Sequence, residues 1–150
     1  MKIKSSSIPE TNNLAKDFLN TIKKGKAATV VGLQGNLGSG KTIFVKAVAE
    51  YLGLKQTVSS PTFVIEKIYQ LSPTSGVEEE GQNYKYLIHI DAYRLEKGEE
   101  LLTLGWKEIS KDPNNLIFIE WPENVKDVLS DDVKYIDFRF IDENTREIIY

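Results

Sequence analysis

Residues 35 to 42 read Gly35-Asn36-Leu37-Gly38-Ser39-Gly40-Lys41-Thr42 and match the pattern G-x-x-x-x-G-K-[ST] at all four fixed positions. A β-branched run of strand length, residues 28–33, precedes this segment, and apolar residues at helical spacing, residues 43–52, follow it. A strand, a glycine-rich loop and a helix in this order form the context in which the pattern binds nucleotide phosphates. We call residues 35–42 the glycine loop.

Each residue type in the glycine loop has a physical role in holding phosphates. Gly35, Gly38 and Gly40 can adopt backbone angles that are closed to residues with a Cβ, so that successive N–H groups turn toward an anion. Lys41 adds a mobile positive charge for the β and γ phosphates, and the Thr42 hydroxyl is suited to hold Mg²⁺. The pattern therefore predicts a nucleoside triphosphate with Mg²⁺ as the ligand.

Length and composition narrow the class of protein. The chain has 150 residues, of which 41% are hydrophobic and 27% charged, which predicts a single globular domain over residues 1–150. The net charge of −3 argues against a protein that binds nucleic acid alone, because such a protein needs a basic face. The absence of cysteine excludes disulfides and thiolate metal sites. No apolar leader or membrane-length apolar stretch is present, so we expect a cytoplasmic protein that does not contact membranes.

Hydrophobic periodicity predicts an α/β fold. We expect helices over residues 11–24 with Thr11 as N-cap, 43–52, 96–109 with a break at Gly105, and 122–129, and strands over residues 28–33, 63–71, 84–90, 116–119, 135–141 and 146–150. The strand 116–119 is apolar on both faces, as in a central strand covered by helices. The polar residues 72–83 predict a mobile hairpin loop. With the glycine loop, this pattern predicts a three-layer sandwich of the P-loop NTPase type around a mixed, partly parallel sheet.

Two acidic residues end predicted strands and are candidate partners of the glycine loop. Glu120 ends the most apolar strand, and ligands in open α/β sheets lie beyond the carboxyl ends of strands. We therefore expect Glu120 to hold Mg²⁺ together with Thr42. Asp91 ends the strand 84–90 and could bind the metal through water, orient an attacking water, or simply form a turn.

Three further residues have an open role at this stage. Thr62 follows the rigid Ser60-Pro61 step and is either a switch-loop hydroxyl for the γ phosphate or part of a plain turn. Trp121 is either a core aromatic or a neighbour of the nucleotide. His89, the single histidine, is expected to satisfy a local hydrogen bond rather than to perform catalysis.

Arginine usage helps to distinguish classes of nucleotide-binding protein. Small-molecule kinases grip the acceptor and the migrating phosphoryl group with several arginines, often on a lid. This chain has only Arg94, Arg139 and Arg146, and the last two lie in the terminal hairpin, far in sequence from the glycine loop. A partner-coupled ATPase therefore fits better than a kinase, and a non-catalytic nucleotide sensor is a third possibility.

Four stretches together identify a family resemblance. The chain resembles the TsaE (YjeE) family, small bacterial ATPases of tRNA threonylcarbamoyladenosine formation, from about Thr11 to Glu123. The matching stretches are Gly35-Asn36-Leu37-Gly38-Ser39-Gly40-Lys41-Thr42 with Phe44, Ser60-Pro61-Thr62-Phe63, His89-Ile90-Asp91-Ala92-Tyr93-Arg94, and Glu120-Trp121-Pro122-Glu123.

The resemblance implies an ATPase that turns ATP into ADP with Mg²⁺ and works with TsaB and TsaD proteins, so that tRNA is met only indirectly. It implies that Lys41, Asp91 and Glu120 act in hydrolysis and that Thr42 and Glu120 hold the metal. The resemblance also places Thr62 in a switch-like loop and Thr11 near the adenine. The full set of nucleotide-binding positions that it implies is Thr11, Gly35, Asn36, Gly38, Ser39, Gly40, Lys41, Thr42, Ile43, Thr62 and Trp121.

The sequence departs from the family pattern at a few places. Ser39 stands where alanine is common and Ile43 where threonine is common, and neither change removes a phosphate ligand. The acidic residues 78–80 belong to an insertion. No N/T-K-x-D guanine-reading motif is apparent, which favours adenine.

Overall fold

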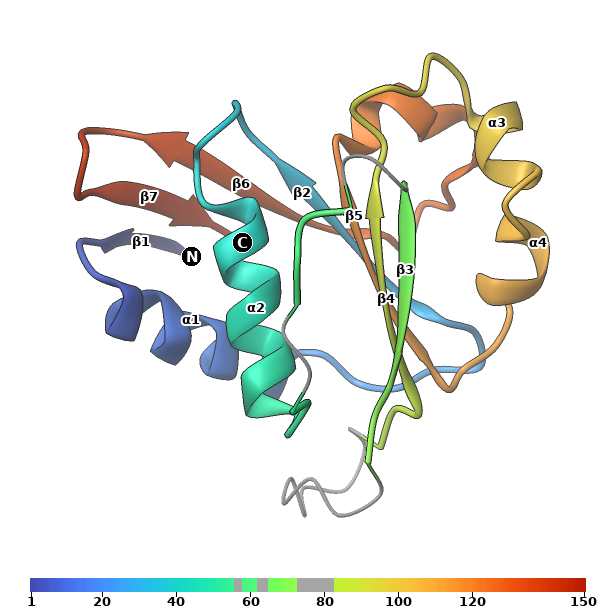
Figure 1. Cartoon of the computed structure of the whole chain (residues 1–150), viewed down its shortest axis with the longest axis horizontal. Helices are drawn as coiled ribbons and strands as arrows, with labels where there is room; N and C mark the ends of the chain where they lie inside the picture. The colour runs from blue at the N-terminus through green and yellow to red at the C-terminus, as the bar shows by residue number, and fades with distance from the viewer. Residues whose placement is uncertain (56–57, 62–64, 73–82) are drawn as a thin grey trace.

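The computed structural model describes residues 1–55, 58–61, 65–72 and 83–150, and these residues form three layers (Figure 1). The middle layer is a seven-stranded mixed sheet. Helices α1 (Ile8–Thr21) and α2 (Lys41–Tyr51) cover one face, and α3 (Gly98–Leu102), α4 (Trp106–Ile109) and the 3₁₀ helix η1 (Pro122–Val128) cover the other. The α/β three-layer fold predicted from the sequence is confirmed.

The sheet has a parallel centre and antiparallel edges. Strands β6, β2, β5 and β4 run parallel to one another, while β1, β7 and β3 join them in antiparallel pairs. In spatial order the strands are β1 (Lys2–Ser5), β7 (Arg146–Ile149), β6 (Lys134–Phe140), β2 (Thr29–Gln34), β5 (Asn115–Glu120), β4 (Tyr86–Asp91) and β3 (Glu66–Gln70). Strand β1 is not among the predicted elements, because four residues with a single central isoleucine show no clear period. The strand depends on pairing with the other end of the chain.

Helix α1 begins earlier than predicted. Its N-cap is Ser7, whose side chain accepts a hydrogen bond from the Glu10 amide at 3.3 Å. Pro9 is tolerated in the first turn because no intrahelical N–H bond is needed there. Thr11 lies inside the helix, where its hydroxyl pairs with that of Ser5 at 2.8 Å. The expectation that Thr11 is the N-cap is therefore wrong.

Most other predicted elements are present within the described residues. Gly105 has a φ of +83° and separates α3 from α4, which confirms the predicted break. The terminal hairpin of β6 and β7 is confirmed, and the segment after Pro122 is a 3₁₀ helix. The predicted loop at residues 72–83 lies almost entirely outside the described residues. Among the described residues, no helix combines the length and the apolar character that a membrane crossing requires.

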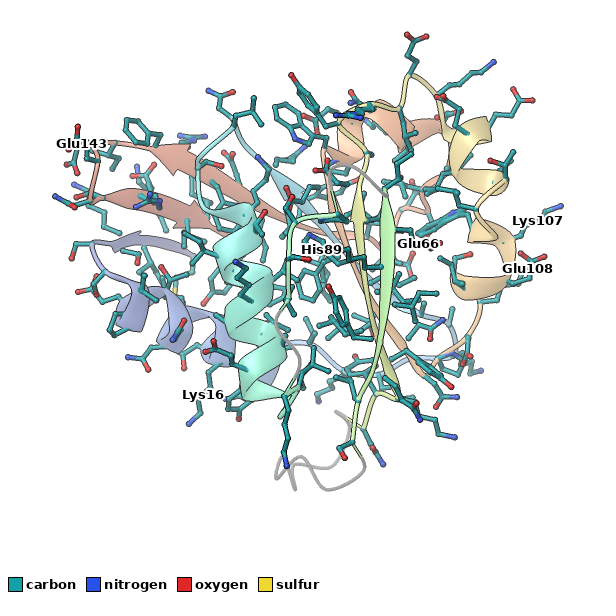
Figure 2. All side chains as sticks on the ribbon, viewed as in Figure 1. Lys16, Glu66, His89, Lys107, Glu108 and Glu143 are labelled. Atoms are coloured by element: carbon teal, nitrogen blue, oxygen red, sulfur yellow. The ribbon has the colours of Figure 1, made fainter. Side chains whose placement is uncertain are left out.

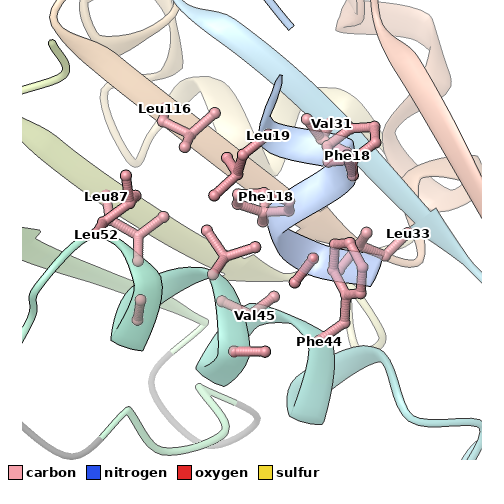
Figure 3. Close-up of a cluster of buried hydrophobic side chains, with 14 of the residues drawn as sticks. Phe18, Leu19, Val31, Leu33, Phe44, Val45, Leu52, Leu87, Leu116 and Phe118 are labelled. Atoms are coloured by element: carbon pink, nitrogen blue, oxygen red, sulfur yellow. The ribbon is translucent and has the colours of Figure 1, made fainter. Parts of the chain in front are cut away.

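Apolar side chains of the sheet point alternately to two cores. Along β5, Leu116 and Phe118 pack toward α1 and α2, while Ile117 and Ile119 pack toward the opposite layer. Figure 3 shows the first core around Phe44, which is fully buried. Its ring meets three others edge-on, with centroids 5.9, 6.4 and 5.5 Å away for Phe18, Phe118 and Phe138. Because Phe44 belongs to the first turn of α2, this packing anchors the end of the helix that carries the glycine loop.

The parallel register brings three strand ends to one edge of the sheet. Glu120 at the end of β5 is paired with Leu33 of β2 on one side and with Asp91 of β4 on the other. The glycine loop leaves β2 at the same edge. Side chains that follow these strands therefore gather around the loop, as expected for open α/β sheets.

Candidate functional site

The glycine loop connects β2 to α2 through left-handed glycines. The φ angles of Gly35, Gly38 and Gly40 are +133°, +74° and +104°, which confirms that these positions use angles unfavourable for other residues. A Cβ on Gly35 would collide with the carbonyl oxygen of Phe138, so only glycine fits there. Gly40 is also the N-cap of α2, so the loop ends at the positive pole of that helix.

Lys41 is folded into the glycine loop. Its side chain is buried, and Nζ donates hydrogen bonds to the carbonyl oxygens of Gly35 and Asn36, the latter at 2.9 Å. Nζ also lies 4.6 Å from the centre of the Trp121 ring, in a cation–π contact. Burial lowers the pKa of Lys41, while the negative charges of Glu120 and Asp91 oppose that effect. The ammonium group is thus held against two carbonyl oxygens of the glycine loop, and a rotation of the side chain would release it to bind an anion.

Glu120 joins the glycine loop to the sheet. Its Oε1 accepts a hydrogen bond from the Thr42 hydroxyl at 2.9 Å and lies 2.8 Å from Nε2 of His89. Burial raises the pKa of Glu120, but the hydrogen bonds from His89 and Thr42 and the charge of Lys41 outweigh it, so the pKa is lowered overall. Glu120 is therefore an ionised carboxylate in contact with a hydroxyl at the start of α2.

Asp91 lies beside Glu120 at the end of β4. Its side chain is buried, and Oδ1 accepts a hydrogen bond from the Tyr93 amide at 3.0 Å. The turn role that the sequence left open is therefore observed. Asp91 also lines a cavity together with Lys41 and Glu120, so the turn fixes a carboxylate that faces the site.

Two cavities lie on either side of Gly40 and Ile43, which line both. We call the cavity that contains Asp91 and Glu120 the acid-side cavity; its volume is about 240 Å³, and most of the predicted site residues line it. Its lining residues are Leu37, Gly38, Ser39, Gly40, Lys41, Thr42, Ile43, Ser60, Asp91, Tyr93, Glu120 and Trp121. The hairpin-side cavity has a volume of about 320 Å³ and lies between the N-terminal segment and the β6–β7 hairpin. Thr11, Phe138 and Arg146 are among its lining residues.

The predicted residues thus do not all line one cavity. Residues 37–42 of the glycine loop line the acid-side cavity together with Asp91, Glu120 and Trp121, whereas Gly35 and Asn36 are not among its lining residues. Thr11 lines the hairpin-side cavity, and Ile43 lines both cavities. Thr62 lies outside the described residues, although its neighbour Ser60 lines the acid-side cavity. Trp121 has a φ of +59°, unusual for a bulky residue, and its ring centre is 5.1 Å from that of Tyr93. Such backbone conformations concentrate at functional sites.

Arg146 is the main site residue that the sequence analysis missed. Although far from the glycine loop in sequence, it is next to Gly40, where a Cβ would lie 3.1 Å from Arg146 Cδ. Its Nε is buried and has no hydrogen-bond partner among the described residues. The sequence held no local signal for this contact, because it depends on the pairing of the terminal hairpin with β2. Tyr93 also lines the acid-side cavity, a position that the sequence does not indicate.

Comparisons with known proteins identify one family. A family model described as "Threonylcarbamoyl adenosine biosynthesis protein TsaE" matches residues 5–148. Proteins named "tRNA threonylcarbamoyladenosine biosynthesis protein TsaE" are similar, one from Rickettsia typhi with 33% identity over 94% of this chain and 88% of its own length. Another, from Borreliella burgdorferi, is 36% identical over 74% of this chain and 70% of its own length.

A solved structure has a similar fold. The crystal structure of Bacillus subtilis YdiB superimposes with a TM-score of 0.71 at 28% sequence identity. The match covers 99% of this chain and 82% of that chain.

Proposed function

This chain belongs to the TsaE family of threonylcarbamoyl adenosine biosynthesis proteins, and we propose that it acts there as a Mg²⁺-dependent ATPase coupled to a TsaB–TsaD-like complex. One observation carries the proposal. A loop of positive-φ glycines, a lysine, a hydroxyl and two strand-end carboxylates converge on one cavity, although they come from α2 and two different strands. This set supplies what a triphosphate and its counter-ion require.

The glycine loop binds the phosphates in this proposal. Its amides and the positive end of α2 attract the anion. Lys41 exchanges its hydrogen bonds to the carbonyls of Gly35 and Asn36 for bonds to phosphate oxygens. Because Lys41 is already desolvated, that exchange costs less than it would for an ammonium group in water.

The donor set at Thr42 and Glu120 fits Mg²⁺. Both contribute hard oxygen atoms, and the pair is already in contact through the Thr42 hydroxyl and Glu120 Oε1. When bound, the ion neutralises charge that develops on the β and γ phosphates. Glu120 is kept ionised by its hydrogen bonds and by Lys41, so it can act as a ligand at neutral pH.

Asp91 supports hydrolysis in this proposal. Its carboxylate is fixed by the Tyr93 amide and lines the same cavity as Lys41, which suits a group that orients an attacking water. The Trp121 and Tyr93 rings beside it provide an apolar wall that limits access of other water molecules.

The nucleoside end extends toward the hairpin-side cavity. That cavity begins at Gly40 and Ile43, the point where the glycine loop passes into α2, and it is lined by Thr11 and Arg146. A nucleotide that follows the loop from one cavity to the other has space there for its sugar and adenine base. ADP, which keeps the nucleoside and two phosphates, occupies the same path after hydrolysis.

The lining of the acid-side cavity supports dependence on a partner. Among the described residues that line it there is no arginine, because Arg146 lies on the other side of Gly40. Phosphoryl transfer is strongly accelerated by an arginine or an equivalent cation, which a partner can supply in trans. Turnover by the isolated chain is therefore expected to be slow.

The direct experiment measures phosphate release by the chain with and without TsaB and TsaD proteins. Stimulation by the partners, lost in Lys41→Ala, supports the proposal. Brisk turnover that the partners leave unchanged contradicts the coupling. Phosphorylation of a metabolite acceptor would identify a kinase instead, and nucleotide binding with full partner function but without hydrolysis would identify a sensor.

A further inference from the structure

The single histidine of the chain is built into the site without touching the cavity. His89 lies on β4, in the interior of the molecule, and its side chain is fully buried (Figure 2). Its Nε2 is 2.8 Å from Glu120 Oε1, the same oxygen that accepts the Thr42 hydroxyl proton at 2.9 Å. One carboxylate oxygen is therefore fixed from the sheet and from the start of α2 at once.

The chemistry of this pair determines which nitrogen carries the proton. An ionised carboxylate can only accept hydrogen bonds, so Nε2 of His89 must be the donor. Nδ1 is buried and has no hydrogen-bond partner among the described residues. The contact with Glu120 is thus the interaction that selects the tautomer of His89.

Lys41 is a second possible partner for the Glu120 carboxylate. The charge of Lys41 attracts Glu120, but these two described side chains form no ion pair. Lys41 instead donates to the carbonyls of its own loop. If Glu120 formed an ion pair with Lys41, the ammonium group would be less available for phosphate and the carboxylate less available for the cation.

We propose that His89 is a positioning residue, which by one N–H···O bond holds Glu120 against Thr42 and away from Lys41, and so sets the Mg²⁺ dependence of nucleotide binding. The inference rests on the proposed function of Glu120 and Thr42 as the metal-binding pair. It requires nothing of His89 in proton transfer. Partners that orient a metal ligand typically change metal affinity about 10- to 100-fold when they are removed.

Nitrogen-15 NMR of the imidazole tests the geometry in the unmodified protein. Because His89 is the only histidine, its ring signals need no assignment by mutation. The expected spectrum shows a protonated Nε2 before and after a non-hydrolysable ATP analogue and Mg²⁺ are added. A proton on Nδ1 alone, or loss of the Nε2 proton when the cation is added, overturns the proposal.

Two matched variants of His89 test whether this residue affects the Mg²⁺ dependence of nucleotide binding. His89→Gln places an amide N–H near the position of Nε2, whereas His89→Asn places it near Nδ1. Calorimetry measures binding of the ATP analogue in EDTA and in Mg²⁺. In EDTA, both variants are expected to bind the analogue with an affinity within about 3-fold of the unmodified chain. Mg²⁺ should raise the affinity of His89→Gln as much as that of the unmodified chain, whereas this increase should be about 10-fold or more smaller in His89→Asn.

The outcomes separate this inference from the function on which it rests. Full Mg²⁺ tightening in His89→Asn overturns the positioning role while leaving the metal site intact. No Mg²⁺ tightening in the unmodified chain contradicts the metal site itself. If the variants do not fold, the nitrogen-15 spectra of the unmodified chain still decide whether Nε2 holds Glu120.

Discussion

Asp91 and Glu120 are register partners in the parallel pair β4 and β5, yet their carboxylates contact different groups. Glu120 Oε1 accepts from Thr42, at the start of α2, whereas Asp91 Oδ1 accepts from the Tyr93 amide in the turn after β4. The two adjacent acids are therefore held by different contacts, Glu120 by a hydroxyl of α2 and Asp91 by an amide of the turn after β4.

Replacing each acid by its amide is expected to separate the roles proposed for them. Glu120→Gln should abolish the Mg²⁺-dependent part of nucleotide binding and leave binding in EDTA nearly unchanged. Asp91→Asn should keep Mg²⁺-dependent binding but lower partner-stimulated hydrolysis by about 100-fold or more, as the loss of a water-orienting group does. Calorimetry and phosphate release measure the two effects. If Asp91→Asn abolished Mg²⁺-dependent binding and Glu120→Gln lowered only hydrolysis, the roles assigned to the two acids would be reversed.

Two glycines of the loop are expected to differ sharply in their tolerance of alanine. Gly38 has a left-handed φ but open space around the position of a Cβ, so Gly38→Ala should cost about 1–2 kcal/mol. Gly35 combines a φ of +133° with a collision against the Phe138 carbonyl, so Gly35→Ala should cost about 3 kcal/mol or more. Urea unfolding without nucleotide measures both values. Equal costs would show that the described loop geometry is wrong.

Arg146 is expected to contribute to nucleotide binding. A charged hydrogen bond contributes about 1.5–3 kcal/mol, so Arg146→Ala should weaken ADP binding about 10-fold or more. Arg139→Ala is the matched control, because Arg139 belongs to the same hairpin and pairs with Asp137 at 2.9 Å. Equilibrium binding of ADP to both variants makes the comparison, and equal affinities would remove Arg146 from the site.

Glu66 is expected to make stability fall as pH rises. It lies on β3, on the side that faces α3 and α4 (Figure 2), and burial raises the pKa of its carboxyl. A raised folded-state pKa gives stability that is fully present below the ordinary value of about 4.3 and is lost as pH rises through the folded value. Glu66→Gln should therefore gain stability relative to the unmodified chain between pH 4 and pH 7.

Chemical denaturation across this pH range measures the effect. Glu108→Gln changes an exposed carboxylate on α4 and should shift stability little at any pH. A difference between Glu66→Gln and the unmodified chain that shrinks with rising pH would contradict the burial of this carboxyl.

The central part of the fold could be predicted from local sequence patterns. The doubly apolar run at residues 116–119 indicates a strand covered on both faces, and β5 is central in the sheet. Gly105 indicates the break between α3 and α4 because its left-handed φ suits glycine. The start of α1 could also have been found, since Ser7, Pro9 and Glu10 form an N-terminal signal that precedes Thr11.

Features that depend on long-range pairing could not be predicted. Strand β1 exists because it pairs with β7, and Arg146 reaches Gly40 because the terminal hairpin joins the sheet beside β2. The bond between His89 and Glu120 joins residues of two strands whose neighbourhood follows only from the strand order. The sequence shows which residues are chemically able to act, and the topology determines which of them meet.

Calorimetric titration of ATP and Mg²⁺ into the unmodified chain, Lys41→Ala and Lys46→Ala tests the central claim most directly. Lys46 is an exposed lysine of the same helix and serves as the control for charge. We expect the unmodified chain and Lys46→Ala to bind alike and Lys41→Ala to bind about 100-fold more weakly, as the loss of a buried charged contact implies. Absence of binding by the unmodified chain, or equal binding by Lys41→Ala, would contradict the account.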